Sequence, residues 1–584
     1  MSLLLLALIT IAVLTVGYFA YGTYIARQYN LDDRSATPAV TKADGIDFVP
    51  TRPFYLLGQH FSAIAAAGPI VGPILACQNF GWLPCVLWIL LGVVFIGAVH
   101  DFSALIASIR HGAHSIAEIA RRNLGPKAFV SLTLFIWLAL LYVIVAFTDA
   151  TVATFIGTDP DLASVAGAEF NKGGAVAAAS VLYILLALVM GVVERTLKPP
   201  MWISTLIFVP ATLGVVWLGT RISTVLVLPP TTWYWIILGY CLVASMLPVW
   251  LLQQSRGYLG GFVLYLAIAI GVIGLLFGNY TIKQPMINPG AGGFSSLGSL
   301  LAGSPDAPPL TTVVFPFLFV TIACGACSGF HGLVCGGTTS KQIAKESHCK
   351  PVAFGAMLLE GFVAIIALST IMMVEPADLR GPDGKPLPPG AIYGEGIARF
   401  MTVILGPEAL VFAKTFGTMA VATFVFDTLD VATRLGRYLL QELFQLRSRI
   451  AGLVMSLLTV GAPLGILLTA EPKSYLLFWT LFGTSNQLLA SLTLLGVTVW
   501  LHNQGRRYWY TFLPMLFVMS ITLTALSVQI LSGIRTAWVK QSLLHAEVLN
   551  AAVGVALLLL AVQFIIQAVR AVQRRPVRPE IPRP

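Results

Sequence analysis

The residues with the clearest chemical potential lie where a long apolar segment is interrupted. Within 52–78, RPFYLLGQHFSAIAAAGPIVGPILACQ, two breaker pairs begin at Gly68 and Gly72, and Gln59 and His60 come before them. Each proline removes a backbone donor and clashes with the preceding turn. An unpaired carbonyl in hydrocarbon costs several kcal/mol. The break therefore predicts that an ion, a substrate or a neighbouring helix occupies the freed carbonyls.

His60 is the first candidate for a coupled proton, because an unperturbed imidazole titrates near neutral pH. A hydrogen bond to a neighbouring helix is the alternative role for His60. The half-helix that follows the break carries partial positive charge at its N-terminus. A substrate carboxylate would therefore be stabilised beside Gly68 and Gly72.

Asp101, with His100 beside it, lies near the end of the apolar segment 84–107. An intramembrane acid is a functional candidate by default, and we count Asp101 among the residues for ion or proton coupling. A salt bridge to an arginine at the end of the segment is the alternative.

Asp427 and Asp430 share one face near the end of the segment 406–430 and are also candidates for ion or proton coupling. Arg434 follows Asp430 by one helical turn, so an ion pair within the helix is the simpler prediction. An inner gate is the other. In the same segment Lys414 needs a partner, and Glu360 is predicted to supply it.

A second group of residues could bind a soft metal. Its members, spaced by three, four and four residues, are Cys324, Cys327, His331 and Cys335. On a helix they would share one face, and such ligands suit zinc or copper. One straight helix cannot surround a tetrahedral ion, so a bend at Gly325 or Gly329, or a ligand from another helix, would be needed. A metal or redox centre is therefore a minor alternative, and the seven cysteines are predicted to be reduced.

The composition predicts an all-α polytopic membrane protein. Of 584 residues 57% are hydrophobic and only 10% are charged, and the mean hydropathy is +0.85. Soluble proteins carry about 25% charged residues. Apolar stretches long enough to cross a bilayer predict about fifteen spans. They lie near 3–25, 54–79, 84–107, 129–156, 175–193, 200–218, 234–253, 259–279, 311–331, 353–373, 406–430, 450–470, 474–501, 508–532 and 545–570.

Basic residues gather in alternate loops, which predicts the orientation. Lysine and arginine crowd the stretches 110–127, 195–198, 341–350, 434–449 and 570–583. Such loops face the cytoplasm, so the N-terminus is predicted outside and the C-terminus inside a bacterial inner membrane. The net charge of +10 then needs no nucleic acid, and the partners expected are the lipid bilayer and a small-molecule substrate. The oligomeric state stays open.

Pro248 interrupts the span 234–253, which runs opposite to the broken span 54–79. Two five-helix units of opposite direction, each opening on a broken helix, are typical of inverted-repeat transporters. Ser245 and Gln253 flank the second break and join Gln59, His60, Gly68 and Gly72 as predicted substrate-binding residues. The predicted domains are 1–50 (first helix and cytoplasmic linker), 51–233 (first repeat), 234–447 (second repeat with a surface helix at 434–446), 448–570 (C-terminal helices) and 571–584 (basic tail).

Five motifs resemble the carbon starvation protein A family. They are HFSAIAAAGPIVGPILA at 60–76, GAVHDF at 97–102, SGFHGLVCGGTTSKQIAKE at 328–346, TLDVATRLGRYLLQE at 428–442 and LFGTSNQLLA at 481–490. The resemblance covers about residues 50–502. It implies an inner-membrane secondary transporter of the LeuT type, whose members are associated with pyruvate or peptide uptake. It also implies that Ser328 supplies a hydroxyl to a cation site, with His331 as a proton relay. Close packing between helices is the alternative role for Ser328.

The sequence therefore predicts a secondary active transporter, not an enzyme, that imports pyruvate or peptides by alternating access. Protons or sodium would drive it, and no cofactor is expected apart from bound Na⁺ or coupled H⁺. A passive channel and a membrane metallo or redox protein are the alternatives.

Overall fold

The structure is a computed structural model that describes residues 2–44, 48–65, 67–157, 170–248, 250–304, 308–381, 384, 386–446, 448–469, 475–540 and 546–573. All regular elements in these ranges are helices, accompanied by isolated β-bridges. In the first half they are α1 (Leu3–Val16), η1 (Gly17–Tyr21), α2 (Gly22–Gln28), α3 (Pro38–Thr41), α4 (Pro53–Ile64), α5 (Gly68–Phe80), α6 (Trp82–Gly92), η2 (Val93–Gly97), α7 (Ala98–Arg110), α8 (Ile116–Leu124), α9 (Pro126–Phe155), α11 (Lys172–Thr196), α12 (Met201–Arg221), α13 (Pro230–Met246) and α14 (Gln253–Phe277).

The second half is again a succession of helices. They are α15 (Phe294–Ala302), η3 (Leu310–Thr312), α16 (Val314–Thr321), α17 (Gly329–Gly337), η4 (Thr339–Lys341), η5 (Glu346–His348), η6 (Lys350–Gly355), α18 (Ala356–Met372), η7 (Pro376–Leu379), α19 (Pro389–Leu405), η8 (Pro407–Ala409), α20 (Leu410–Phe444), α21 (Arg449–Thr469), α22 (Tyr475–Asn503), α23 (Trp509–Lys540) and α24 (Ala546–Gln573).

A bundle of four segments forms the centre. The half-helices α4 and α5 pack against α18, the half-helix α17 packs against α7 and α4, and α16 packs against α5. The segments α7 and α18 are almost wholly buried, and so is α5. Because apolar helices in a bilayer are not driven together by water, this burial reflects close packing of small side chains and backbone.

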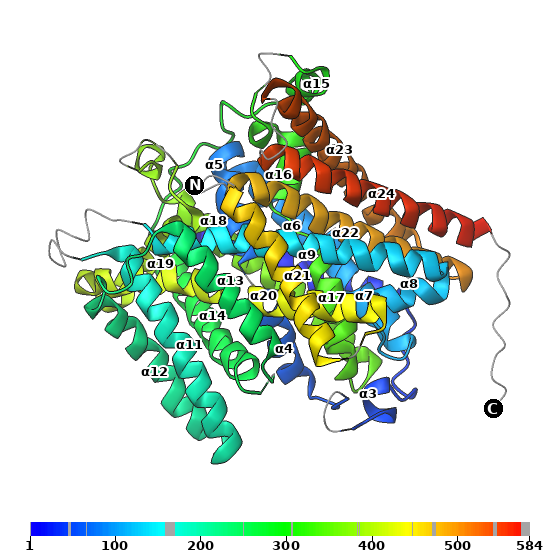
Figure 1. Ribbon diagram of the computed structural model, residues 1–584, viewed down its shortest axis with the longest axis horizontal. Coiled ribbons are helices and arrows are strands. Elements are labelled where there is room, and N and C mark those ends of the chain that lie inside the picture. Colours follow the sequence, from blue (N-terminus) through cyan, green and yellow to red (C-terminus); the bar gives the residue numbers. More distant parts are fainter. Residues whose placement is uncertain are drawn as a thin grey trace.

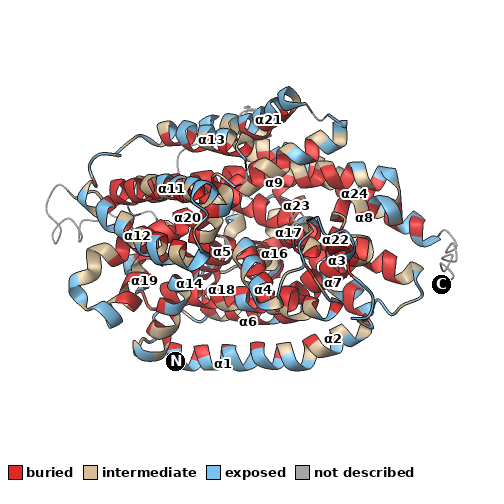
Figure 2. Ribbon diagram, turned by 90° about the horizontal axis from the view of Figure 1, so that it is seen from below, coloured by how far each residue is buried: buried red, intermediate tan, exposed pale blue. Residues whose placement is uncertain are grey.

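A second layer of long helices flanks this bundle. Its members α9 and α20 pack on each other, α21 packs on both and on α13, and α22 packs on α9 and on α17. The remaining helices are peripheral: α11 and α12 lie side by side at one end of the molecule, and α23 and α24 at another (Figure 1). Figure 2 shows α1 along one edge, with much of its surface exposed.

Hydrogen bonds join the segment between α2 and α4 to the loop that follows α17. Arg110 Nε donates to Glu346 at 2.9 Å, and the Asp32 backbone N–H donates to the same carboxylate. Hydrogen bonds from the hydroxyl and the backbone N–H of Ser347 hold the pKa of Asp33 below its ordinary value. The first helix is therefore joined to the central bundle by polar contacts at one end.

Within the described ranges, eleven helices are long and apolar enough to cross a membrane, or twelve if the bent pair α4 and α5 counts as one span. This supports a polytopic membrane protein. The predicted span 234–253 corresponds to the 17 residues of α13, and 311–331 to the two short helices α16 and α17. The count of fifteen stays a prediction.

One local prediction is wrong. The surface helix expected at 434–446 is not a separate element, because α20 continues through to Phe444. Helix α19, for which no span was predicted, packs on α20, α14 and α18. Its glycines permit this approach: a Cβ on Gly396 would lie 2.2 Å from Thr370.

Candidate functional site

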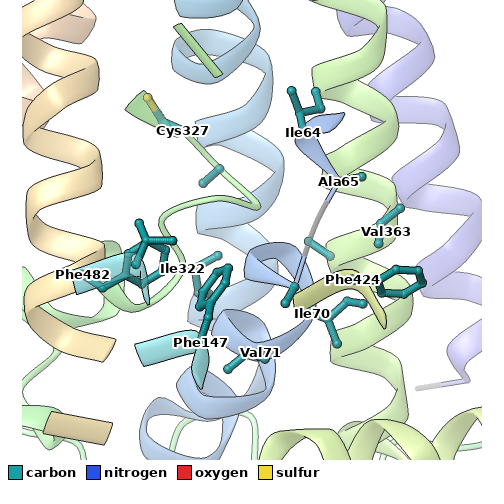
Figure 3. Packing of buried hydrophobic residues seen from close by; sticks show 14 of the residues in the cluster. Ile64, Ala65, Ile70, Val71, Phe147, Ile322, Cys327, Val363, Phe424 and Phe482 are labelled. Carbon is teal, nitrogen blue, oxygen red and sulfur yellow. The ribbon is translucent and has the colours of Figure 1, made fainter. Parts of the chain in front are cut away.

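The first helix break lies inside the central bundle. The half-helix α4 ends at Ile64, α5 begins at Gly68, and their axes differ by 47°. Figure 3 shows Ile64 and Ala65 on one side of the break and Ile70 and Val71 on the other. Apolar side chains from other elements close around it, among them Phe147, Ile322, Val363, Phe424 and Phe482.

Gly68 and Gly72 let a second broken helix approach the first. A Cβ on Gly68 would lie 2.4 Å from Cys324 Sγ, and a Cβ on Gly72 would lie 2.6 Å from the Thr321 carbonyl oxygen. The chain is not helical between α16 and α17, which is the unwound stretch that Gly68 and Gly72 contact. The predicted span at 311–331 is therefore interrupted between α16 and α17.

Replacing Gly72 by Ala is expected to destabilise the protein by about 1–3 kcal/mol, because the new methyl group would meet backbone, which cannot rotate away. The thermal midpoint of the purified protein would measure this. Gly239→Ala is the matched control, since a Cβ there meets nothing within 4 Å. Equal midpoints for the two variants would contradict the close approach.

Neighbouring side chains satisfy the carbonyls freed at the end of α16. The Trp88 indole donates to the Phe319 and Ile322 carbonyls at 3.2 and 3.1 Å. The Trp479 indole donates to the Thr321 carbonyl at 3.1 Å, and Gln487 also donates to that of Phe319. At this break a neighbouring helix therefore takes the role that an ion or a substrate could have taken.

Asn486 holds the start of α17. Its Oδ1 accepts from the Phe330 backbone N–H at 2.9 Å, and its Nδ2 donates to Ser328 Oγ at 3.1 Å and to Cys324 Sγ at 3.3 Å. Ser328 occupies the N-cap position of α17 and is fully buried. Its hydroxyl thus contacts a side chain of α22.

A continuous row of ionisable side chains crosses the bundle. Asp101 Oδ1 lies 2.7 Å from His100 Nδ1, and Asp101 Oδ2 lies 2.9 Å from His331 Nδ1. On its other side, His331 Nε2 lies 3.2 Å from Glu360 Oε2. All four side chains are at most 1% exposed. We call these four residues the buried relay; α7, α17 and α18 contribute to it.

His60 approaches this row from α4. Its Nδ1 lies 2.8 Å from Thr339 Oγ1, and its Nε2 lies 4.0 Å from Cys335 Sγ. Cys335 Sγ in turn lies 3.5 Å from the Asp101 carbonyl. The imidazole of His60 is therefore one residue away from the buried relay, so all four segments of the central bundle meet here.

The break at Pro248 is occupied by an arginine. Arg434 Nη2 donates to the carbonyls of Ala244 and Leu247 at 2.7 and 2.8 Å, which are the groups freed at the end of α13. The prediction that Arg434 pairs with Asp430 within α20 is therefore wrong. A guanidinium with several donors can reach two carbonyls at once, and a tertiary contact prevails over the local one.

The predicted substrate residues do not all converge. Ser245 Oγ donates to Leu242 and Ser456 at 2.8 and 3.0 Å, on the side of α13 that faces α21. Gln59 is exposed, whereas its neighbour His60 is buried, so the two side chains point apart. Gln253 begins α14, beyond the Pro248 break. Only His60, Gly68 and Gly72 lie at the first break or beside the buried relay.

Asp427 and Asp430 share a partner from another helix. Arg256, at the start of α14, lies with its Nε 3.1 Å from Asp427 Oδ1 and with its Nη1 against Asp430 Oδ2. Tyr240 OH donates to Asp430 at 2.8 Å. The arginine is 1% exposed, so this is a buried ion pair between α14 and α20. This group is separate from the buried relay.

Lys414 pairs with Glu395 of α19 at 2.8 Å. The prediction that Glu360 is its partner is wrong, because Glu360 faces His331. Helix α19 was not predicted, so its acid could not be considered.

The proposed metal face is also not assembled. Cys324 and Cys327 lie in the unwound stretch, whereas His331 and Cys335 lie on α17. His331 is held between two carboxylates, and Cys335 faces His60. Within the described part of the chain, no three His, Cys, Asp or Glu side chains are grouped so as to hold a metal ion.

A family comparison decides where this architecture belongs. The family described as "Carbon starvation protein CstA" matches residues 2–381 and 388–525. The chain belongs to the CstA family. The motifs around His60, Asp101 and His331 all lie inside the matched region, and the resemblance predicted from those motifs is confirmed.

Relatives of this CstA family member are named either as peptide transporters or as a pyruvate/proton symporter. The "Peptide transporter CstA" of Helicobacter pylori is 33% identical over 572 residues, covering 87% of this chain and 79% of the relative. That of Bacillus subtilis is 32% identical, covering 98% and 97%. The "Pyruvate/proton symporter BtsT" of Escherichia coli is 31% identical, covering 91% and 82%. These names support a transporter.

Among solved structures, an Eremococcus coleocola manganese transporter matches this CstA family member with a TM-score of 0.44 at 14% identity, covering 91% of this chain and 99% of the other. The bacterium's transporter was solved in complex with an aromatic bis-isothiourea substituted compound.

Sequence reasoning missed three residues of this region. His100 was noted only as the neighbour of Asp101, Glu360 was assigned to Lys414, and Asn486 was given no structural role. The signal for Glu360 was present, because an acid in the middle of an apolar segment demands a buried partner. His60 and His331 lie on other apolar segments and had been given no acidic partner, so either could have been matched to Glu360.

Proposed function

We propose that this chain is a proton-coupled secondary transporter that imports a small carboxylate such as pyruvate, or peptides, by alternating access. The buried relay is the observation that supports it. Two acids and two imidazoles lie in one row across three helices, and a row of this kind binds or releases a proton with little movement of atoms. A membrane protein without such a task has little reason to bury four ionisable groups.

The coupling would work through His60. It belongs to α4, the half-helix in front of the first break, and approaches the relay through Cys335, whose Sγ lies between His60 Nε2 and the Asp101 carbonyl. A change in the charge of His331 therefore acts on the helix that we expect to move. Sodium at Ser328 is the alternative driving ion, and the contact of this hydroxyl with Asn486 disfavours it.

We further propose a five-plus-five inverted repeat with boundaries other than 51–233 and 234–447. One unit would comprise α4/α5, α6–α7, α9, α13 and α14. The other would comprise α16/α17, α18, α20, α21 and α22. The packing supports this division, because α13 contacts α9, α20 and α21, just as α21 contacts α20, α9 and α13. The hairpin α11–α12 would then be an insertion in the first unit.

The repeat explains two further similarities. The second helix of each unit contains a π-helical turn, η2 and η6, and an additional helix precedes each third one, α8 and α19. The substrate would bind at the breaks of α4/α5 and α16/α17, where the start of α5 offers its positive end to a carboxylate. Ser245 and Gln253 would then have no part in binding it.

Uptake of labelled pyruvate and of a labelled dipeptide into proteoliposomes tests the function. Each substrate is offered with an imposed proton gradient, with an imposed sodium gradient and with neither. We expect accumulation of one substrate with the proton gradient only. Counterflow separates a carrier from a passive channel, since only a carrier is stimulated by substrate on the far side. Uptake that ignores both gradients and shows no counterflow would contradict the proposal.

His60→Ala and His331→Ala test the coupling separately. We expect each to weaken accumulation driven by the proton gradient more than substrate exchange, because exchange needs no net proton movement. His502→Ala, at the far end of α22, is the control and should leave both activities unchanged. Equal loss of accumulation and exchange would remove the imidazoles from the proton path.

A further inference from the structure

A cavity of about 470 Å³ lies beside the first helix, next to its contacts with the central bundle. It lies between α1–η1 on one side and α4, α14 and η6–α18 on the other. Its lining is almost entirely apolar and consists of Ile11, Leu14, Thr15, Tyr18, Phe19, Leu57, Val272, Pro351, Gly355, Leu358, Leu359 and Phe362. The volume falls within the range of small-ligand sites, roughly 300–1,000 Å³.

This cavity opens toward the surface of the protein that faces lipid. Phe19 is 69% exposed and Leu359 is 44% exposed, although both line the cavity. Figure 2 shows α1 at the edge of the molecule, with much of its surface exposed. An apolar space that opens within a bilayer is filled by hydrocarbon.

The length of the cavity matches one leaflet. On η6–α18 the lining runs from Pro351 to Phe362, which at 1.5 Å per residue is about 16 Å. The hydrocarbon core of a bilayer is about 30 Å thick, so one leaflet is about 15 Å. The cavity is therefore about as long as the hydrocarbon part of one leaflet, which is the length that one acyl chain spans.

The side chain of Lys350 lies at one end of the cavity. Lys350 Nζ lies 4.4 Å from the centre of the Tyr18 ring and donates to Thr23 Oγ1 at 2.7 Å. Tyr18 lines the cavity, and so does Pro351, the neighbour of Lys350. Basic residues at this side of the membrane mark the cytoplasmic face. That leaflet carries the anionic lipids, which attract such cations.

We propose that this cavity binds one phospholipid of the cytoplasmic leaflet, with an acyl chain along α18 and an anionic headgroup at Lys350. The lipid would lie against Leu57, which belongs to the half-helix α4 that carries His60. It would therefore fill the space into which α4 could otherwise move. The inference does not depend on which substrate is transported.

Gly355 offers a direct test. Its backbone is helical, and a Cβ built there would meet only Tyr18 at 3.5 Å and the Lys350 carbonyl at 3.8 Å. Gly355→Leu would therefore fill the cavity without displacing the backbone. Gly214→Leu is the matched control, because Gly214 is an exposed helical glycine of α12 with nothing within 4 Å.

The readout is native mass spectrometry of the full-length protein, delipidated in detergent and then titrated with phosphatidylglycerol or phosphatidylcholine. Wild type and Gly214→Leu should bind one phosphatidylglycerol in preference to phosphatidylcholine. Gly355→Leu should lose that binding by about tenfold, the effect of excluding two methylene groups. Lys350→Gln should lower the preference for the anionic lipid by about fivefold, the effect of one cation near the surface.

Binding by Gly355→Leu equal to that by Gly214→Leu would overturn the proposal. Equal affinity of wild type for the two lipids would remove the headgroup assignment. A small membrane protein that occupies the wild type after delipidation, and is absent from Gly355→Leu, would replace the lipid as the occupant. A folded Gly355→Leu variant is recognised by a thermal midpoint within the range of the control.

Discussion

Glu360→Gln is expected to reduce accumulation driven by a proton gradient by about tenfold or more, whereas substrate exchange continues. Glu360 and Asp101 flank His331 from opposite sides, at 3.2 and 2.9 Å. The amide keeps the shape of the side chain but can neither take up nor release a proton. A tenfold loss corresponds to about 1.4 kcal/mol, which is about the contribution of one hydrogen bond to a charged group.

Uptake and exchange in the same proteoliposomes measure this effect. Glu118→Gln is the control, because Glu118 lies on α8 and pairs with the exposed Arg121 and Arg122. Such surface pairs contribute little, so both activities should stay at the wild-type level. If Glu360→Gln accumulated substrate as wild type does, Glu360 would not belong to the proton path.

Arg256→Met is expected to destabilise the protein by about 3–5 kcal/mol. This arginine is 1% exposed and is the partner of both Asp427 and Asp430, and removing one partner leaves buried charge uncompensated. Its guanidinium also lies 5.3 Å from the centre of the Phe426 ring, so a methionine of similar length keeps the apolar contact. The thermal midpoint and the yield of monodisperse protein are the measurements.

A second variant separates charge from packing. Combining Arg256→Met with Asp430→Asn removes one of the two unpaired acids and should recover part of the lost stability. Arg121→Met is the control on the surface, where the loss should stay below about 1 kcal/mol. If the double variant were no more stable than the single one, charge would not be the cause.

Much of this architecture could be predicted from the sequence because it depends on local composition. Apolar segments and the family resemblance follow from the order of residues alone, and both are confirmed. The break at Gly68 was also predicted, since a Gly-Pro pair interrupts a helix whatever surrounds it. His60, Asp101 and His331 stood out because ionisable residues in apolar segments are rare.

One wrong prediction arose because a partner far along the chain prevailed over a local one. Arg434 reaches two carbonyls of α13 and leaves Asp430 to Arg256. Lys414 turns to Glu395 on a helix that the sequence did not predict. The second break was placed at Pro248 because proline is visible in a sequence. At 322–328 the chain unwinds without one, because Trp88 and Trp479 satisfy its carbonyls.

The hairpin α11–α12 has a consequence for topology, which follows from parity. Two crossings return the chain to the side from which it started, so adding or removing such a hairpin leaves the orientation of each later helix unchanged. The pair α23 and α24 has the same property. The alternation of basic loops therefore does not reveal either pair. An orientation predicted from charge can be right even when the predicted boundary of a repeat is wrong. The proposed boundary of the repeat is supported instead by the packing of α13 on α21.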